Sequence, residues 1–143
     1  MTTRADKAEP LQIFTDGGSR GNPGPAGIGA VLLDEKGKKV AEVSRYIGDS
    51  TNNVAEYLAV IYGLQEAVFL KAGEIVLNVD SQLVARQLKG EYRVKDQNIR
   101  RFFDIALNLF RGFDKVEIRE ISREENTDAD ALANKAINLK ALI

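Results

Sequence analysis

The chain of 143 residues contains no histidine and no cysteine. These absences exclude a Ser-His-Asp triad, a Cys-His pair and an ordinary zinc site. Disulfide bonds are also impossible, as is usual for proteins of a reducing compartment, so we expect a cytoplasmic protein. Any metal centre must be built from oxygen ligands, which suit a hard divalent cation.

Long apolar runs are missing as well. No stretch reaches the length that spans a bilayer, and the first ten residues lack the apolar segment of a signal peptide. We therefore expect no membrane contact, and we expect residues 1–10 to form a disordered tail. With 44% hydrophobic and 29% charged residues, the chain has the composition of one globular domain, which we place at residues 11–143.

Apolar patterns along the chain predict five strands and four helices. The strands are expected at residues 11–16, 26–35, 39–47, 74–80 and 115–121. The helices are expected at residues 52–72, from about residue 81, through residues 99–110 and at residues 127–139. Gly73 is expected to end the first helix. The order βββαβααβα predicts an α/β fold with a five-stranded mixed sheet flanked by helices.

Asp16 and Asp80 each end an apolar strand, and the two strands are expected to be parallel. Ligands of such sheets bind outside the carboxyl ends of the parallel strands. Carboxylates held close together raise each other's pKa unless a cation neutralises them. The pair therefore predicts a divalent-cation site. The glycine-rich residues 17–25 lead into another strand and carry no lysine, so they do not match a nucleotide-binding loop.

Three further carboxylates are candidates for the same site. Glu56 is the only charged residue between Val54 and Gln65, although a glutamate near a helix N-terminus is also common on a surface. Asp128 and Asp130 lie about 200° apart around the last helix, so only one of them faces a given site. Spacing alone leaves that choice open, because Asp128 also suits the start of a helix dipole.

Four motifs follow one another along the chain. They are residues 15–19 (TDGGS) with residues 21–24 (GNPG), residues 51–56 (TNNVAE), residues 80–82 (DSQ) and residues 126–133 (NTDADALA). In their strand and helix contexts these motifs resemble ribonuclease H of type 1, over residues 11–140. An integrase or exonuclease of the wider fold is expected to lack GNPG and TNN, and a non-catalytic binding module would not require every carboxylate.

The resemblance implies an endoribonuclease that hydrolyses the RNA strand of RNA–DNA hybrids by a two-metal-ion mechanism. The expected cofactor is two Mg²⁺ ions, with Mn²⁺ as an alternative, and the expected partner is the hybrid, bound by a monomer. The catalytic and metal-binding carboxylates that the family motifs imply are Asp16, Glu56, Asp80 and Asp130. The Ala-Asp-x-Leu-Ala pattern selects Asp130 over Asp128.

The resemblance also implies which residues contact the substrate. The residues expected to line the minor groove and to sense 2′-hydroxyl groups are Gly17, Ser19, Asn22, Asn52, Asn53 and Gln82. Thr51 is expected at a pocket for a DNA phosphate.

The sequence departs from the family pattern at three places. The loop at residues 122–125 lacks the histidine that many members carry, and Glu124 and Glu125 are candidate replacements. The basic segment, which we define as residues 86–101 with six basic and two acidic residues, is shorter than the basic handle of many members. Asp96 stands where an asparagine is usual near the DNA-phosphate pocket.

Overall fold

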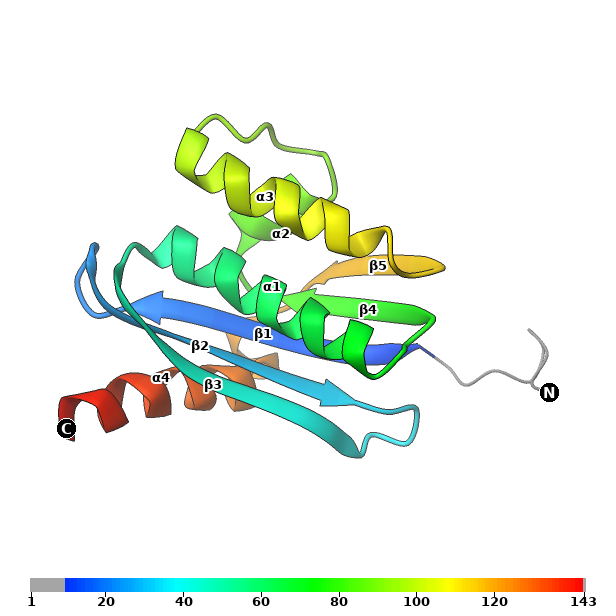
Figure 1. Ribbon diagram of the computed structural model, residues 1–143, viewed down its shortest axis with the longest axis horizontal. Helices are drawn as coiled ribbons and strands as arrows, with labels where there is room; N and C mark the ends of the chain where they lie inside the picture. The colour runs from blue at the N-terminus through cyan, green and yellow to red at the C-terminus, as the bar shows by residue number, and fades with distance from the viewer. Residues whose placement is uncertain (1–9, 143) are drawn as a thin grey trace.

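The computed structural model describes residues 10–142 and contains one sheet with helices on both faces (Figure 1). The strands are β1 (Leu11–Ser19), β2 (Gly24–Leu33), β3 (Lys39–Ser50), β4 (Glu74–Val79) and β5 (Lys115–Glu120). The helices are α1 (Asn52–Phe69), α2 (Gln82–Leu88), α3 (Gln97–Phe110) and α4 (Thr127–Leu142), with a 3-10 turn at Arg123–Glu125. The tail expected at residues 1–10 lies, except for Pro10, outside the described residues.

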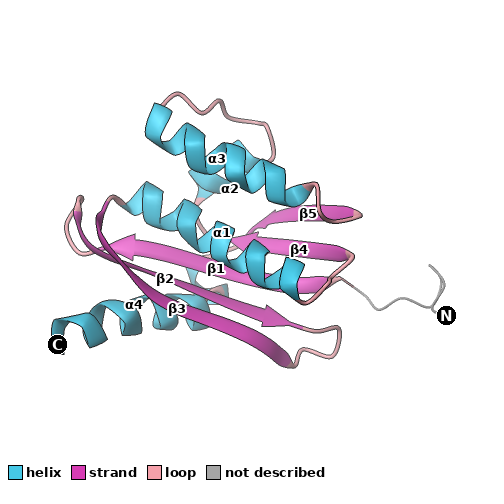
Figure 2. Cartoon of the chain, in the orientation of Figure 1, coloured by secondary structure: helices cyan, strands magenta, loops and turns pink. Residues whose placement is uncertain are grey.

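The five strands pair in the order β3-β2-β1-β4-β5 (Figure 2). β1, β4 and β5 are parallel, whereas β2 runs antiparallel to both β1 and β3. The predicted element order and the five-stranded mixed sheet are therefore confirmed. Within the described residues, no helix combines the length and the apolar character needed to cross a membrane.

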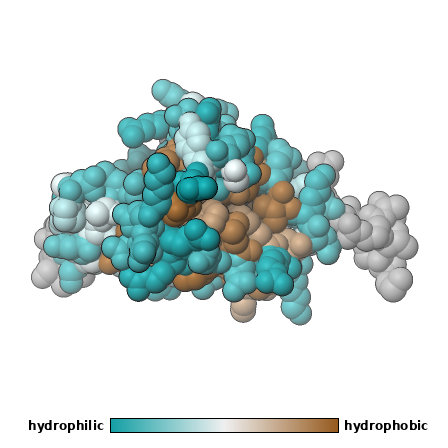
Figure 3. Space-filling model, turned by 90° about the horizontal axis from the view of Figure 1, so that it is seen from above, coloured by the Kyte–Doolittle hydropathy of each residue, from teal (hydrophilic) through white to brown (hydrophobic). Residues whose placement is uncertain are grey.

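The main core fills the space between the sheet and α1. Ile13 of β1, Leu64 of α1 and Leu77 of β4 are fully buried there. α3 packs on α1, and α4 covers the opposite face of the sheet (Figure 1). The outer surface seen from above in Figure 3 is largely hydrophilic, with apolar atoms gathered near its middle.

Two glycines of β2 allow α4 to lie directly on the sheet. A Cβ atom added at Gly29 would lie 2.2 Å from the Ala129 carbonyl oxygen, and one at Gly27 would lie 2.6 Å from the Ala133 carbonyl oxygen. Real Cβ atoms do not approach backbone so closely, so glycine is required at both positions. This contact fixes the height of α4 above the sheet, and with it the position of Asp130.

Several element ends differ from the prediction, among them those of β1 and α1. β1 does not end at Asp16 but continues to Ser19, because residues 17–19 stay paired with β2 after the pairing with β4 has ended at Thr15. α1 ends at Phe69 rather than at Gly73, and the left-handed residue is Lys71, at φ 60°. The spacing of apolar residues predicts which face of an element is buried. It does not predict where a strand stops forming hydrogen bonds with each of its neighbours.

The substitution Gly29→Ala is expected to lower the free energy of unfolding by about 1–3 kcal/mol, the usual effect of overpacking. The added methyl group would collide with the backbone of α4. The matched control is Gly18→Ala, whose Cβ would meet only Asn52 Oδ1, at 3.8 Å. Urea denaturation of both variants measures the difference, and equal stability would contradict the close packing of α4.

Candidate active site

The carboxyl ends of β1 and β4 place two aspartates side by side. The parallel pairing ends with Thr15 opposite Val79, so Asp16 and Asp80 are the next residues of neighbouring strands. Thr15 contacts Gly63 of α1, and Val79 belongs to the core beneath that helix. Because side chains alternate along a strand, Asp16 and Asp80 project toward the opposite face, which carries α4.

Glu56 reaches this site from the start of α1. A Cβ atom at Gly17 would lie 2.2 Å from the Ala55 carbonyl oxygen, so only glycine permits the helix backbone to approach β1. The Gly17 N–H group donates a hydrogen bond to Glu56 Oε1 at 3.3 Å. The close contact thus holds a buried carboxylate, 9% exposed, beside Asp16.

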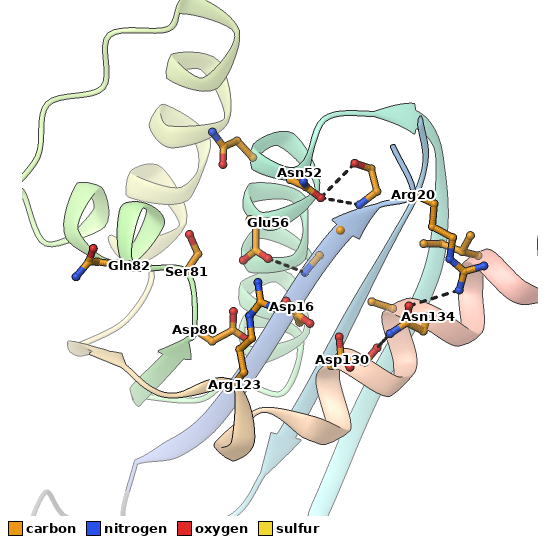
Figure 4. Close-up of a pocket in the computed structure, with 16 residues that line it drawn as sticks. Asp16, Arg20, Asn52, Glu56, Asp80, Ser81, Gln82, Arg123, Asp130 and Asn134 are labelled. Atoms are coloured by element: carbon orange, nitrogen blue, oxygen red, sulfur yellow. Dashed lines mark hydrogen bonds between the residues drawn. The ribbon is translucent and has the colours of Figure 1, made fainter. Parts of the chain in front are cut away.

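Carboxylate oxygens of Asp16, Glu56 and Asp80 lie within 4.8 Å of one another (Figure 4). Burial, together with the charges of Asp80 and Asp130, raises the pKa of Asp16 to about 7. Burial and the charge of Asp16 raise the pKa of Glu56 well above its ordinary value. A cation would remove this repulsion, and a crowded set of oxygen donors without nitrogen or sulfur fits a hard divalent ion.

Asp130 lines the same pocket, which has a volume of about 530 Å³, from the first turn of α4 (Figure 4). Asp128 lies outside it, in a separate hollow beside Phe14 and Val31. Between them in sequence, Ala129 is fully buried against the sheet. The structure therefore brings Asp130, and not Asp128, to the other three carboxylates.

The residues expected to contact substrate divide into two groups. Five of them line the pocket, and these are Gly17, Ser19, Asn52, Asn53 and Gln82. Asn22 and Thr51 do not line it, and both support the start of α1. Asn22 Oδ1 accepts from the Asn52 N–H group at 3.0 Å, and Thr51 Oγ1 caps the helix by accepting from the Val54 N–H group at 3.3 Å.

Arg123 is a pocket residue that sequence reasoning missed. It enters from the 3-10 turn, in the loop where a histidine was expected from the family (Figure 4). None of the ion pairs among the described residues involves it. Glu124 does not line the pocket, and Glu125 accepts from the Ser122 N–H and hydroxyl groups at 3.1 and 3.0 Å. The residue of this loop that faces the carboxylates is thus a cation.

Asn126 is a second residue that was not singled out from the sequence, although it begins the last motif. Its side-chain amide lies beneath the pocket and contacts Asp80. The motif includes this position. Spacing along the sequence, however, cannot show that the side chain is buried or that it contacts Asp80, 46 residues away.

The basic segment, residues 86–101, runs from α2 through a short loop into α3. Arg86 and Arg100 form ion pairs with Glu120 and Asp104, at 3.3 and 3.2 Å. Asp96 caps α3, since its Oδ1 accepts from the N–H groups of residues 98 and 99 at 2.8 and 3.2 Å. The sequence departure at Asp96 therefore has a structural role in starting this helix.

Comparison with known proteins agrees with this fold. A family model described as "Reverse transcriptase-like" matches residues 14–136. Ribonuclease HI of Halobacterium salinarum is 44% identical over 133 residues, which are 93% of this chain and 67% of that protein. The crystal structure of RNase H1 from this archaeon superimposes with a TM-score of 0.88 at 44% identity, covering 91% and 98% of the two chains.

Two further solved structures are similar. The N-terminal RNase H domain of Rv2228c from Mycobacterium tuberculosis has a TM-score of 0.88 at 42% identity, covering 90% of this chain and 99% of that one. The chain spans only 36% of full-length Rv2228c, which is called a bifunctional protein. LC11-RNase H1 in complex with an RNA/DNA hybrid has a TM-score of 0.87 at 42% identity, covering 93% and 99%.

The mixed sheet, with acidic residues at the carboxyl ends of its parallel strands, defines an RNase H-like protein. With these identities over nine-tenths of its length, the chain belongs to the ribonuclease H family, on its type 1 branch.

The free energy of unfolding of the metal-free protein is expected to fall as pH rises from about 4 to 7. The pKa of Asp16 is about 7 in the folded protein, whereas an aspartate in an unfolded chain titrates near ~3.9. The folded state therefore keeps a proton that the unfolded state has released. Stability decreases with pH wherever the unfolded state binds fewer protons.

Urea denaturation in EDTA across this pH range measures the effect, with Asp16→Asn as the control. The variant should lose less stability between these pH values than the wild type, and added Mg²⁺ should restore wild-type stability above pH 7. Parallel pH profiles of the two proteins would show that Asp16 does not carry the raised pKa.

Proposed function

We propose that this protein is an endoribonuclease that hydrolyses the RNA strand of RNA–DNA hybrids, with residues 11–143 as its catalytic domain. The observation that carries the proposal is the convergence of three carboxylates within 4.8 Å at the ends of parallel strands, in a pocket that Asp130 also lines. Further support comes from LC11-RNase H1, a relative at 42% identity that has been solved in complex with an RNA/DNA hybrid.

Asp16, Glu56, Asp80 and Asp130 are the proposed catalytic residues and the proposed ligands of two Mg²⁺ ions, which Mn²⁺ can replace. All four offer carboxylate oxygens, the donors that Mg²⁺ takes in proteins. A bound cation of this kind lowers the pKa of a water molecule and stabilises negative charge on a phosphate. The protein holds the carboxylates in place beforehand, through the strand register and the Gly17–Glu56 hydrogen bond.

Arg123 faces the substrate phosphate in this proposal. Its side chain enters an acidic pocket without an ion-pair partner among the described residues. A guanidinium group suits phosphate recognition, because its fixed fork of donors matches two phosphate oxygens. The cation thus occupies the place that many family members give to histidine.

The proposed substrate contacts are polar residues that line the pocket. Ser19, Asn52, Asn53 and Gln82 present hydroxyl and amide groups that can bind 2′-hydroxyl groups, which distinguish RNA from DNA. Gly17 lines the pocket, Asn22 orients Asn52, and Thr51 lies at the proposed DNA-phosphate position. Contacts of this kind give little preference for base sequence. The proposed enzyme acts as a monomer in the cytoplasm.

Cleavage of labelled duplexes tests the function. With Mg²⁺ or Mn²⁺, the protein should cut the RNA strand of an RNA–DNA hybrid and leave double-stranded DNA intact, and EDTA should stop the reaction. Asp80→Asn should abolish cleavage at saturating Mg²⁺, because one metal-binding carboxylate is lost, while the circular dichroism spectrum stays that of the wild type. Cleavage by Asp80→Asn at the wild-type rate would refute the metal site.

Asp130→Asn and Asp128→Asn form a matched pair for the last motif. Asp130→Asn should lower kcat by about 100-fold, as is typical when one group that stabilises transition-state charge is removed. Asp128→Asn should leave kcat near the wild-type value and cost less than ~1 kcal/mol of stability, because this residue lies outside the pocket and is placed to favour the helix dipole. Single-turnover cleavage and thermal unfolding of both variants separate the two roles, and a reversed pattern would make Asp128 the ligand.

A further inference from the structure

Asn126 joins the last motif to both acidic strands. The side chain is 1% exposed and lies between β1 and the end of β4. Its Nδ2 group donates to the Thr15 carbonyl oxygen at 2.9 Å and to Asp80 Oδ2 at 2.7 Å. One buried amide thus connects the backbone before Asp16 with the carboxylate of Asp80.

The orientation of this amide is fixed by its partners. Both neighbours of the Nδ2 group are acceptors, so the opposite orientation would set the amide oxygen against two oxygens. Asn126 Oδ1 is itself buried and accepts no hydrogen bond from any described residue. The two donated hydrogen bonds therefore hold the side chain.

The side chain does not cap α4, although asparagine is common at that position. The Asn126 carbonyl oxygen accepts the first helical hydrogen bond, from the Asp130 N–H group at 3.1 Å, which makes Asn126 the residue before the helix. A capping side chain would accept an N–H group of the first turn with its oxygen. Here that oxygen accepts nothing from the described chain, so helix capping does not explain the residue.

We propose that Asn126 is a positioning residue for the metal site. Its amide holds Asp80 Oδ2 by a hydrogen bond, and this hydrogen bond turns Asp80 Oδ1 toward the pocket. This inference rests on the function proposed above. A carboxylate that is free to rotate loses that freedom when it binds an ion, whereas the hydrogen bond from Asn126 has already restricted Asp80. Groups that orient metal ligands in this way typically contribute a factor of about 10–100 in metal affinity.

Asn126→Ser tests the proposal. Serine is favoured before the first turn of a helix, so α4 should still form, but its side chain is too short to reach Asp80. Calorimetric titration of the metal-free protein should show weaker binding of Mg²⁺ and of Mn²⁺, by about 10- to 100-fold. The KM for the hybrid should stay at the wild-type value, and raising the Mg²⁺ concentration should recover kcat.

Asn78→Ala is the matched control. Asn78 is 2% exposed, and its Nδ2 group also donates to a β1 carbonyl oxygen, that of Ile13, at 3.0 Å. Its other acceptors are Gln12 Oε1 and the Val76 carbonyl oxygen, and neither is a carboxylate. The control removes a comparable buried amide, so it should lose stability and keep its metal affinity within about twofold of the wild type.

The outcomes distinguish this inference from the proposed function. Two outcomes would refute only the role of Asn126, provided that the wild type cleaves hybrids and binds Mg²⁺. In the first, Asn126→Ser binds Mg²⁺ as tightly as the wild type. In the second, Asn78→Ala loses as much Mg²⁺ affinity as Asn126→Ser does. If the wild type neither binds Mg²⁺ nor cleaves hybrids, both proposals fail.

A second test uses the wild-type protein alone, so it does not depend on whether a variant folds. In nitrogen-15 spectra, the side-chain amide signals of Asn126 should shift as Mg²⁺ is added, because Asp80 Oδ2 accepts from that amide. The signals of the Asn78 amide should not shift. Unchanged Asn126 signals at saturating Mg²⁺ would overturn the proposal.

Discussion

Repulsion among crowded carboxylates is the constraint that the rest of this structure must overcome. Asp16, Glu56 and Asp80 bring oxygen atoms within 4.8 Å of one another, and burial with mutual repulsion raises the pKa of Asp16 to about 7. Such a cluster persists only where the surrounding fold leaves its members no other position. The parallel register of β1 and β4 and the approach of α1 to Gly17 supply that constraint.

The opposite face of the sheet completes the site through α4. Glycines at positions 27 and 29 let this helix lie on β2, and Asn126 connects its start to Thr15 and Asp80. The same segment then carries Arg123 and Asp130 into the pocket. The 3-10 turn, Asn126 and the first turn of α4 thus deliver a cation, a buried amide and a fourth carboxylate, so the packing of α4 and the geometry of the site are coupled.

The structure also shows how the chain accommodates its departures from the family pattern. The loop without histidine presents Arg123 to the pocket, while Glu125 accepts hydrogen bonds from Ser122. Asp96, in place of an expected asparagine, caps α3. Arg86 and Arg100 of the basic segment are held in ion pairs. The acidic centre keeps the carboxylates that the motifs imply, and the departures from the family pattern lie in the elements around it.

The sequence by itself determined the element order, the mixed sheet and the four carboxylates, because apolar periodicity and short motifs are local properties of the chain. The family motif also selected Asp130 over Asp128, a choice that the spacing of the two residues around one helix had left open. Tertiary structure alone decided that β1 continues past Asp16, that Lys71 takes the left-handed turn, and that Arg123 and Asn126 belong to the site. The end of β1 and the place of Asn126 depend on partners far along the chain, and these contacts exist only once the sheet and α4 have packed.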